Sequence, residues 1–216
     1  MKKIASLVLV LVLISCNSNE EMLLPKADKT IVKEVYDHSP IYLFFRVKEK
    51  DTVAELNRKN AIGTSNWIFN IDKRLPLKVV IPHLQFMKEK RKKGMHTNDK
   101  AEDYFSYADS IGKNLAFLPF TKVNYKLEKP KSGVTIFFSK DNKVLVFNNL
   151  SEKGKEVTKT ELLKHLLELK TDKSMQFVFC HDQNCSYEQF LQNSIFIKEF
   201  KAQLPVYNVT NEEFVF

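Results

Sequence analysis

The sequence predicts an α/β protein with mixed sheets, built from two related units that each pack helices on one face of a small sheet. Runs rich in β-branched and aromatic residues alternate with helical patterns, which favours helices packed on a sheet. The two halves also match, because laying Trp67 on Phe177 places Asp72 on Asp182. With 44% hydrophobic and 12% aromatic residues, the chain is expected to fold rather than remain disordered.

The first unit is assigned to residues 38–129 and the second to residues 130–216, which begin with the Pro- and Gly-containing linker at 130–133. Pro76 suits the first turn of a helix, and Pro82 either kinks that helix or marks its true start. The elements expected in the first unit are a strand at 41–47, a weakly helical segment at 51–60, a buried strand at 67–72, the helix from Pro76, an inserted polar loop at about 94–114 and a strand-like segment at 114–127.

The second unit carries clearer local signals. Two capping boxes predict helix starts, one from Thr158 to Glu161 and one from Ser186 to Gln189. Around them we expect a hairpin turning at residues 141–142, a strand at 175–180 and a last strand at 204–209, with 214–216 as its extension. Asp72 and Asp182 are expected to cap the following helix or to fix the turn before it.

The N-terminus has the pattern of an export signal. A basic start, Lys2-Lys3, precedes an apolar run that is too short to span a bilayer. The run ends in Leu13-Ile14-Ser15-Cys16, which resembles the lipobox of bacterial lipoproteins. That resemblance implies a signal peptide at 1–15, lipid on Cys16 and a tether at 16–37. The alternatives are an ordinary secretory signal or a short buried helix.

Lipid on Cys16 would hold the protein to a membrane of the bacterial cell envelope without a spanning helix. The acidic pair Glu20-Glu21 resembles surface-export signals, so a periplasmic and a surface-exposed position both remain open. The net charge is +8, and loss of Lys2 and Lys3 with the signal would lower it by two. An exported protein meets anionic headgroups or cell-wall polymer, so no nucleic-acid partner is expected.

The densest charge cluster closes the helix predicted after Pro76. Cations at a helix C-terminus are favoured by the helix dipole, which is one explanation of the cluster. The other is a basic docking patch made of Lys88, Lys90, Arg91, Lys92 and Lys93.

Two cysteines remain after Cys16, and their spacing leaves three possibilities open. Cys180 and Cys185 can form a disulfide, remain free thiols, or act as a redox pair. A metal site is not expected, because strand alternation places His181 opposite Cys180 and Asp182. The sequence contains no phosphate loop, dinucleotide fingerprint or hydrolase motif, so neither a cofactor nor catalytic residues are predicted.

The second unit resembles the periplasmic domain of the ExbD/TolR family. The residues that carry the likeness are Val144-Leu145-Val146-Phe147-Asn148-Asn149, Val157-Thr158 with Glu161-Leu162-Leu163, Phe177-Val178-Phe179 with Asp182, and Tyr187 with Phe190. The resemblance covers about 134–210 well and 41–127 faintly. It implies a mixed sheet with two helices on one face, paired either as a homodimer or as a pseudo-dimer within the chain.

The family implies partners of the ExbB/TonB type or the cell wall. Family members have a membrane-spanning helix with a proton-handling Asp, which the short apolar run here lacks, so proton translocation is not expected. The predicted function is a non-catalytic, lipid-anchored accessory that binds partners, for instance by strand addition. The alternatives are a thioredoxin-like thiol protein using Cys180 and Cys185, and a surface lipoprotein that binds an anionic polymer.

Overall fold

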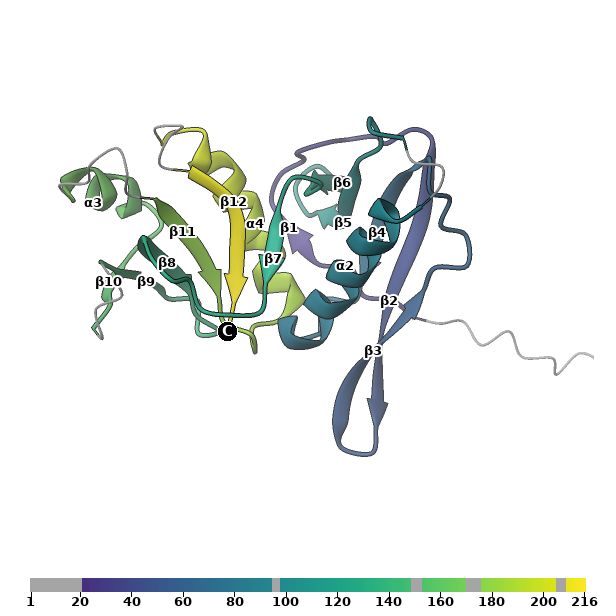
Figure 1. Ribbon diagram of the computed structural model, residues 1–216, viewed down its shortest axis with the longest axis horizontal. Coiled ribbons are helices and arrows are strands. Elements are labelled where there is room, and N and C mark those ends of the chain that lie inside the picture. The colour runs from purple at the N-terminus through teal and green to yellow at the C-terminus, as the bar shows by residue number, and fades with distance from the viewer. Residues whose placement is uncertain (1–20, 95–97, 149–152, 170–175, 205–208) are drawn as a thin grey trace, which may run out of the picture.

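The computed structural model describes residues 21–94, 98–148, 153–169, 176–204 and 209–216 (Figure 1). These residues form two six-stranded mixed sheets and three helices. The predicted fold class, two related α/β units with helices packed on one face of a small mixed sheet, is confirmed.

The first sheet has the spatial order β1-β5-β4-β2-β3, and β6 also pairs with β5. Strands β2, β4 and β5 are parallel, whereas β3 is antiparallel to β2. The strands are β1 (Lys26–Ala27), β2 (His38–Lys48), β3 (Asp51–Asn57), β4 (Asn66–Ile71), β5 (Asp103–Asp109) and β6 (Asn114–Pro119).

The second sheet has the order β10-β9-β8-β11-β12-β7. Its middle strands, β9-β8-β11-β12, repeat the order and directions of β3-β2-β4-β5 in the first sheet. This shared topology supports the internal repeat seen in the sequence. The strands are β7 (Asn124–Lys126), β8 (Val134–Phe138), β9 (Val144–Phe147), β10 (Lys155–Val157), β11 (Phe177–His181) and β12 (Val209–Val215).

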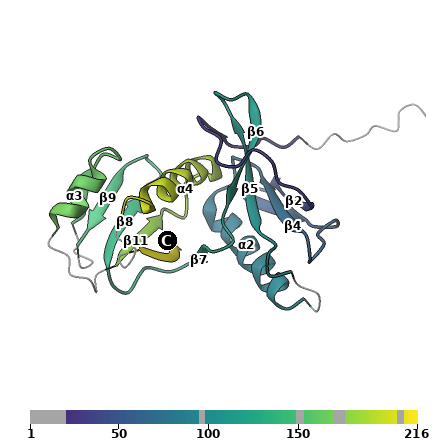
Figure 2. The ribbon, with the colours of Figure 1, turned by 90° about the horizontal axis from the view of Figure 1, so that it is seen from above.

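Two long helices, α2 (Leu77–Lys92) and α4 (Tyr187–Lys201), lie between the sheets (Figure 2). The buried residues of α2 recur at helical spacing and pack on the first sheet. Helix α4 serves both cores, because Phe190 packs in the first and Phe200 in the second. The short helix α3 (Leu162–Glu168) packs in the second core.

Strand β7 links the two units. It follows the last strand of the first unit, yet it pairs in parallel with β12 of the second sheet. The chain therefore passes from one sheet to the other before the linker at 130–133.

Several local predictions are confirmed. The Ser186 hydroxyl accepts from the backbone of Gln189 in a complete capping box at the start of α4. Thr158 and Glu161 exchange the equivalent bonds, but α3 begins only at Leu162, with Glu161 at its N-cap. Helix α2 begins directly after Pro76 and continues through Pro82.

Four expectations are corrected. The weakly helical segment at 51–60 contains β3, and the inserted loop expected at 94–114 contains β5, a strand paired on both sides. The last strand lies at Val209–Val215 rather than at 204–209, of which 205–208 are outside the described residues. The segment expected as a tether is part of the fold where it is described, because Lys26 and Ala27 pair with β5.

Candidate functional site

Equivalent turns precede α2 and α4, and an aspartate stabilises each. Asp72 Oδ1 accepts from the backbone of Arg74 at 3.0 Å, and Asp182 Oδ1 accepts from the backbone of Asn184 at 2.8 Å. Both aspartates therefore fix the turn, which was one of the two predicted roles. Burial opposes ionisation of Asp72, but the guanidinium of Arg74, 2.7 Å away, lowers the pKa of this carboxyl.

These two turns also join the units to each other. The backbone N–H of Leu77 donates to the carbonyl of Cys185 at 3.1 Å, and that of Tyr187 donates to the carbonyl of Leu75 at 2.8 Å. Leu75 and Leu77 correspond to Cys185 and Tyr187 in the repeat, so the two bonds are exchanged by an approximate two-fold relation. The two units therefore contact each other through equivalent turns.

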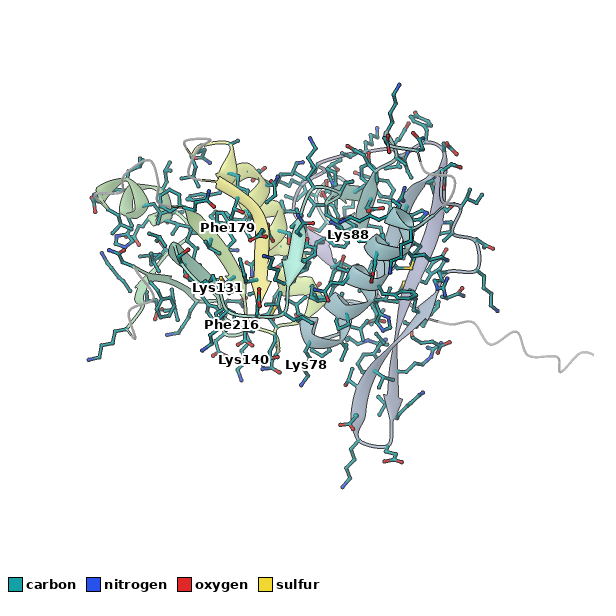
Figure 3. All side chains as sticks on the ribbon, in the orientation of Figure 1. Lys78, Lys88, Lys131, Lys140, Phe179 and Phe216 are labelled. Carbon is teal, nitrogen blue, oxygen red and sulfur yellow. The ribbon has the colours of Figure 1, made fainter. Side chains whose placement is uncertain are left out.

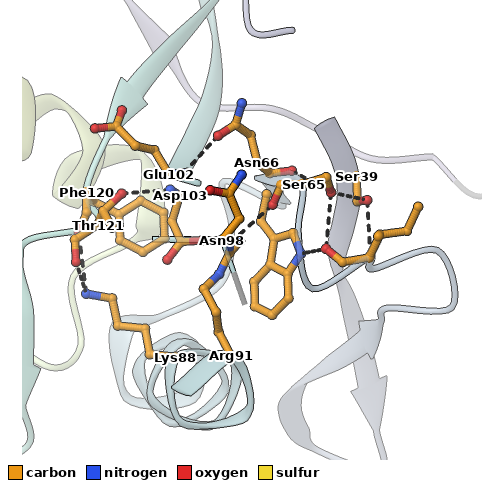
Figure 4. Close-up of polar contacts among 12 residues, drawn as sticks. Ser39, Ser65, Asn66, Lys88, Arg91, Asn98, Glu102, Asp103, Phe120 and Thr121 are labelled. Atoms are coloured by element: carbon orange, nitrogen blue, oxygen red, sulfur yellow. Dashed lines mark hydrogen bonds and ion pairs between the residues drawn. The ribbon is translucent and has the colours of Figure 1, made fainter. Parts of the chain in front are cut away.

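Arg91, one of the five cations of the predicted basic patch, points into the protein (Figure 4). Its Nη2 donates to Asp103 Oδ1 at 2.9 Å and its Nη1 to the Ser65 carbonyl at 3.2 Å. The guanidinium carbon lies 3.8 Å from the ring centre of Trp67. Burial raises the pKa of Asp103 even with Arg91 against it. Arg91 is therefore a structural cation.

Lys88 also faces inward, at the junction between α2 and the segment leading to β7 (Figures 3 and 4). Its Nζ donates to the carbonyls of Phe120 and Thr121, at 3.4 and 3.0 Å, and to that of Val123. Burial lowers the pKa of Lys88 to about 8. The side chain of Lys88 therefore connects α2, through hydrogen bonds, to the segment that continues into the second unit.

The prediction of a basic docking patch is therefore wrong for Lys88 and Arg91, because both side chains bond to groups inside the protein. Lys90, Lys92 and Lys93 remain exposed, and Lys93 is paired with Glu89 at 2.6 Å. Only a part of the predicted cluster can meet an external anion. The helical spacing could have predicted that these two side chains face inward, since Lys88 and Arg91 continue the stripe of buried residues on α2.

Both cysteines of the second unit are free and buried. Cys180 packs with Phe214 on one face of the second sheet, whereas Cys185 belongs to the core of the first unit. Burial raises the pKa of the Cys185 thiol to about 12 and that of Cys180 further still. The structure corresponds to the free-thiol possibility rather than to the disulfide or the redox pair.

A buried ionic cluster joins α4 to β11 and β12, and the sequence analysis missed it. Glu213 accepts from Lys201 at 3.0 Å and lies 3.4 Å from Nε2 of His181, whose side chain is fully buried. Burial opposes ionisation of Glu213, but the hydrogen bond from His181 and the charge of Lys201 lower its pKa. Because these three residues lie far apart in the sequence, no local sequence pattern predicts that they form a cluster.

The hairpin of β2 and β3 projects beyond the first sheet (Figure 1). Strand β4 pairs with β2 only as far as Leu43, so residues 44–48 pair with β3 alone. Strand β3 is itself the last strand of the sheet in the described part of the chain. Val47 is 61% exposed on this hairpin. Unpaired backbone groups on both strands are therefore available to another polypeptide.

Within the described ranges, no three His, Cys, Asp or Glu side chains gather closely enough to hold a metal ion. No helix in those ranges has the length and apolar character needed to cross a membrane. The predicted lipidation site, Cys16, lies outside the described residues. Comparisons with protein-family models, with curated proteins and with solved structures find no significant match.

Proposed function

We propose that this chain is a lipid-anchored, non-catalytic envelope protein that binds partners as an accessory of an ExbD/TolR-like transport or energy-transduction system. The observation that carries the proposal is the reciprocal main-chain bridge between the two units, Leu77 to Cys185 and Tyr187 to Leu75. The ExbD/TolR resemblance implies units that work in pairs. This chain holds such a pair in a single polypeptide.

The hairpin of β2 and β3 is the proposed docking element. An added strand gains main-chain hydrogen bonds at a free sheet edge, and alternate side-chain pockets supply selectivity. On one face of the hairpin, the guanidinium of Arg46 lies 5.1 Å from the ring centre of Phe44, which is only 7% exposed, and Glu55 lies 2.7 Å from Arg46 Nε. A partner strand would find the exposed side chain of Val47 and the Arg46–Glu55 ion pair beside the edge.

Lipid on Cys16 is the proposed anchor, on the basis of the lipobox-like residues before it. It would keep the pseudo-dimer close to the membrane in which ExbB- or TonB-like partners operate. The proposal is compatible with either face of the membrane, periplasmic or surface-exposed.

The two alternative functions have less support. A thiol–disulfide protein needs an accessible thiol of low pKa, whereas burial raises the pKa of both Cys180 and Cys185. A polyanion-binding lipoprotein would use the basic cluster of α2, but Lys88 and Arg91 are engaged inside the protein.

Site-specific photo-crosslinking in the native envelope tests the docking element. A photoreactive residue replaces Val47 on the hairpin, and the matched control replaces Leu167 on α3, because both side chains are more than half exposed. We expect defined crosslinked products from position 47 and few from position 167. Equal yields at the two positions, or none at position 47, would refute docking through the hairpin.

A further inference from the structure

A pocket of about 310 Å³ lies between the two units. One wall comes from residues 118–123 of the first unit, and the other from α4 and β12 of the second. Its volume equals that of about ten water molecules, at ~30 Å³ each in the liquid. A ligand of about that many non-hydrogen atoms would touch both units.

The floor of the pocket holds an unsatisfied hydroxyl. Ser194 is 9% exposed, lines the pocket, and its Oγ has no hydrogen-bond partner among the described residues. A buried hydroxyl without a partner is costly, and native proteins usually satisfy such a group. Around it the floor is apolar, formed by Leu118, Phe120 and Ile197.

The rim of the pocket is basic. Lys122 reaches it from the first unit and Lys198 from the second, and both residues are exposed. Neither has an ion-pair partner in the part of the chain that the structure describes. Of the two acids in the lining, Glu213 is already paired with Lys201, and Glu102 accepts from the hydroxyl of Tyr104.

We propose that this pocket binds a small carboxylate with a short apolar body. A carboxylate only accepts hydrogen bonds, so it complements the Ser194 hydroxyl and the ammonium groups of Lys122 and Lys198. The apolar body would cover Leu118 and Ile197. Because the two lysines belong to different units, the bound anion would hold the units together. This inference does not depend on the proposed partner-binding function.

Lysine acylation of the full-length protein in membranes, read by mass spectrometry, tests the site with hexanoate as the probe. A ligand of this size binds with a Kd of about 10 mM, so about 20 mM hexanoate should slow acylation of Lys122 and Lys198 roughly threefold. Lys50 and Lys90 are exposed and lie outside the pocket lining, so their rates should not change. Hexanol at the same concentration should protect neither pocket lysine, because it lacks the anion.

The variant Ser194→Ala separates binding from folding. Removing an unsatisfied buried hydroxyl should leave the protein at least as stable as the wild type. The same change should raise the Kd for hexanoate about tenfold, because it removes the hydrogen bond to the charged group, and the protection at about 20 mM should fall from roughly threefold to about 1.2-fold. The proposal is overturned if hexanol protects equally, if Lys50 and Lys90 are protected as well, or if Ser194→Ala retains full protection.

Discussion

Replacing Arg91 by Met tests whether this cation stabilises the fold or serves an external partner. Met retains much of the apolar stem and removes the guanidinium that meets Asp103 and the Trp67 ring. Lys90→Met is the matched control, because Lys90 is exposed on the same helix and next to Arg91 in the sequence.

The expected loss follows from the burial of the pair. The side chains of Arg91 and Asp103 are 13% and 3% exposed, and removing one partner of a buried pair costs about 3–5 kcal/mol. The contact with Trp67 contributes about 1 kcal/mol more. Lys88 also lies near enough to favour ionised Asp103, which offsets part of the loss. We therefore expect the free energy of unfolding to fall by about 3 kcal/mol at neutral pH.

Thermal and urea unfolding followed by circular dichroism measure this difference. The midpoint of thermal unfolding should fall by about 6–12 °C for Arg91→Met and hardly change for Lys90→Met. Arg91 lowers the pKa of Asp103, so its loss raises that pKa further. As the pH falls and Asp103 takes up a proton in both proteins, the pair is lost from the wild type and the deficit should shrink. A loss below about 0.5 kcal/mol, or one independent of pH, would refute a structural role for Arg91.

Three further predictions concern the second unit and the anchor. Glu213→Gln should lower the free energy of unfolding by about 2–4 kcal/mol, because it leaves Lys201 unpaired. The pKa of Glu213 is lowered, so the difference should disappear as the pH falls through that lowered value, and unfolding at neutral and acidic pH checks both statements. Cys180 and Cys185 should react with iodoacetamide at least about 1000-fold more slowly in the folded than in the unfolded chain, and rapid alkylation of the folded protein would contradict their burial. Cys16→Ala should abolish incorporation of a labelled fatty acid in the producing cell, whereas labelling that persists would place the lipid elsewhere.

Features with local causes were predictable from the sequence. The capping box at Ser186 and the turn at Asp182 depend on residues two or three positions apart, and both form as expected. The match between Asp72 and Asp182 was also informative, since equivalent bonds form in both turns.

Features that depend on distant partners were not predictable in the same way. The polar run at 95–100 led to the assignment of the whole segment to a loop, although the aromatic residues of β5 favour a strand, and β4 and β6 pair with that strand. The Glu213 cluster and the pocket around Ser194 arise only when α4 meets β12 and the first unit. The helical spacing of Arg91 indicated that its side chain faces inward, but its charge led to the prediction that it lies on the surface.

Crosslinking of the intact, anchored protein in its native envelope, followed by mass spectrometry of the captured proteins, tests the central proposal most directly. The account predicts recovery of ExbB-, ExbD- or TonB-like proteins, with crosslinks that map to the hairpin of β2 and β3. Recovery of disulfide-linked partners through Cys180 or Cys185, with no such components, would contradict it.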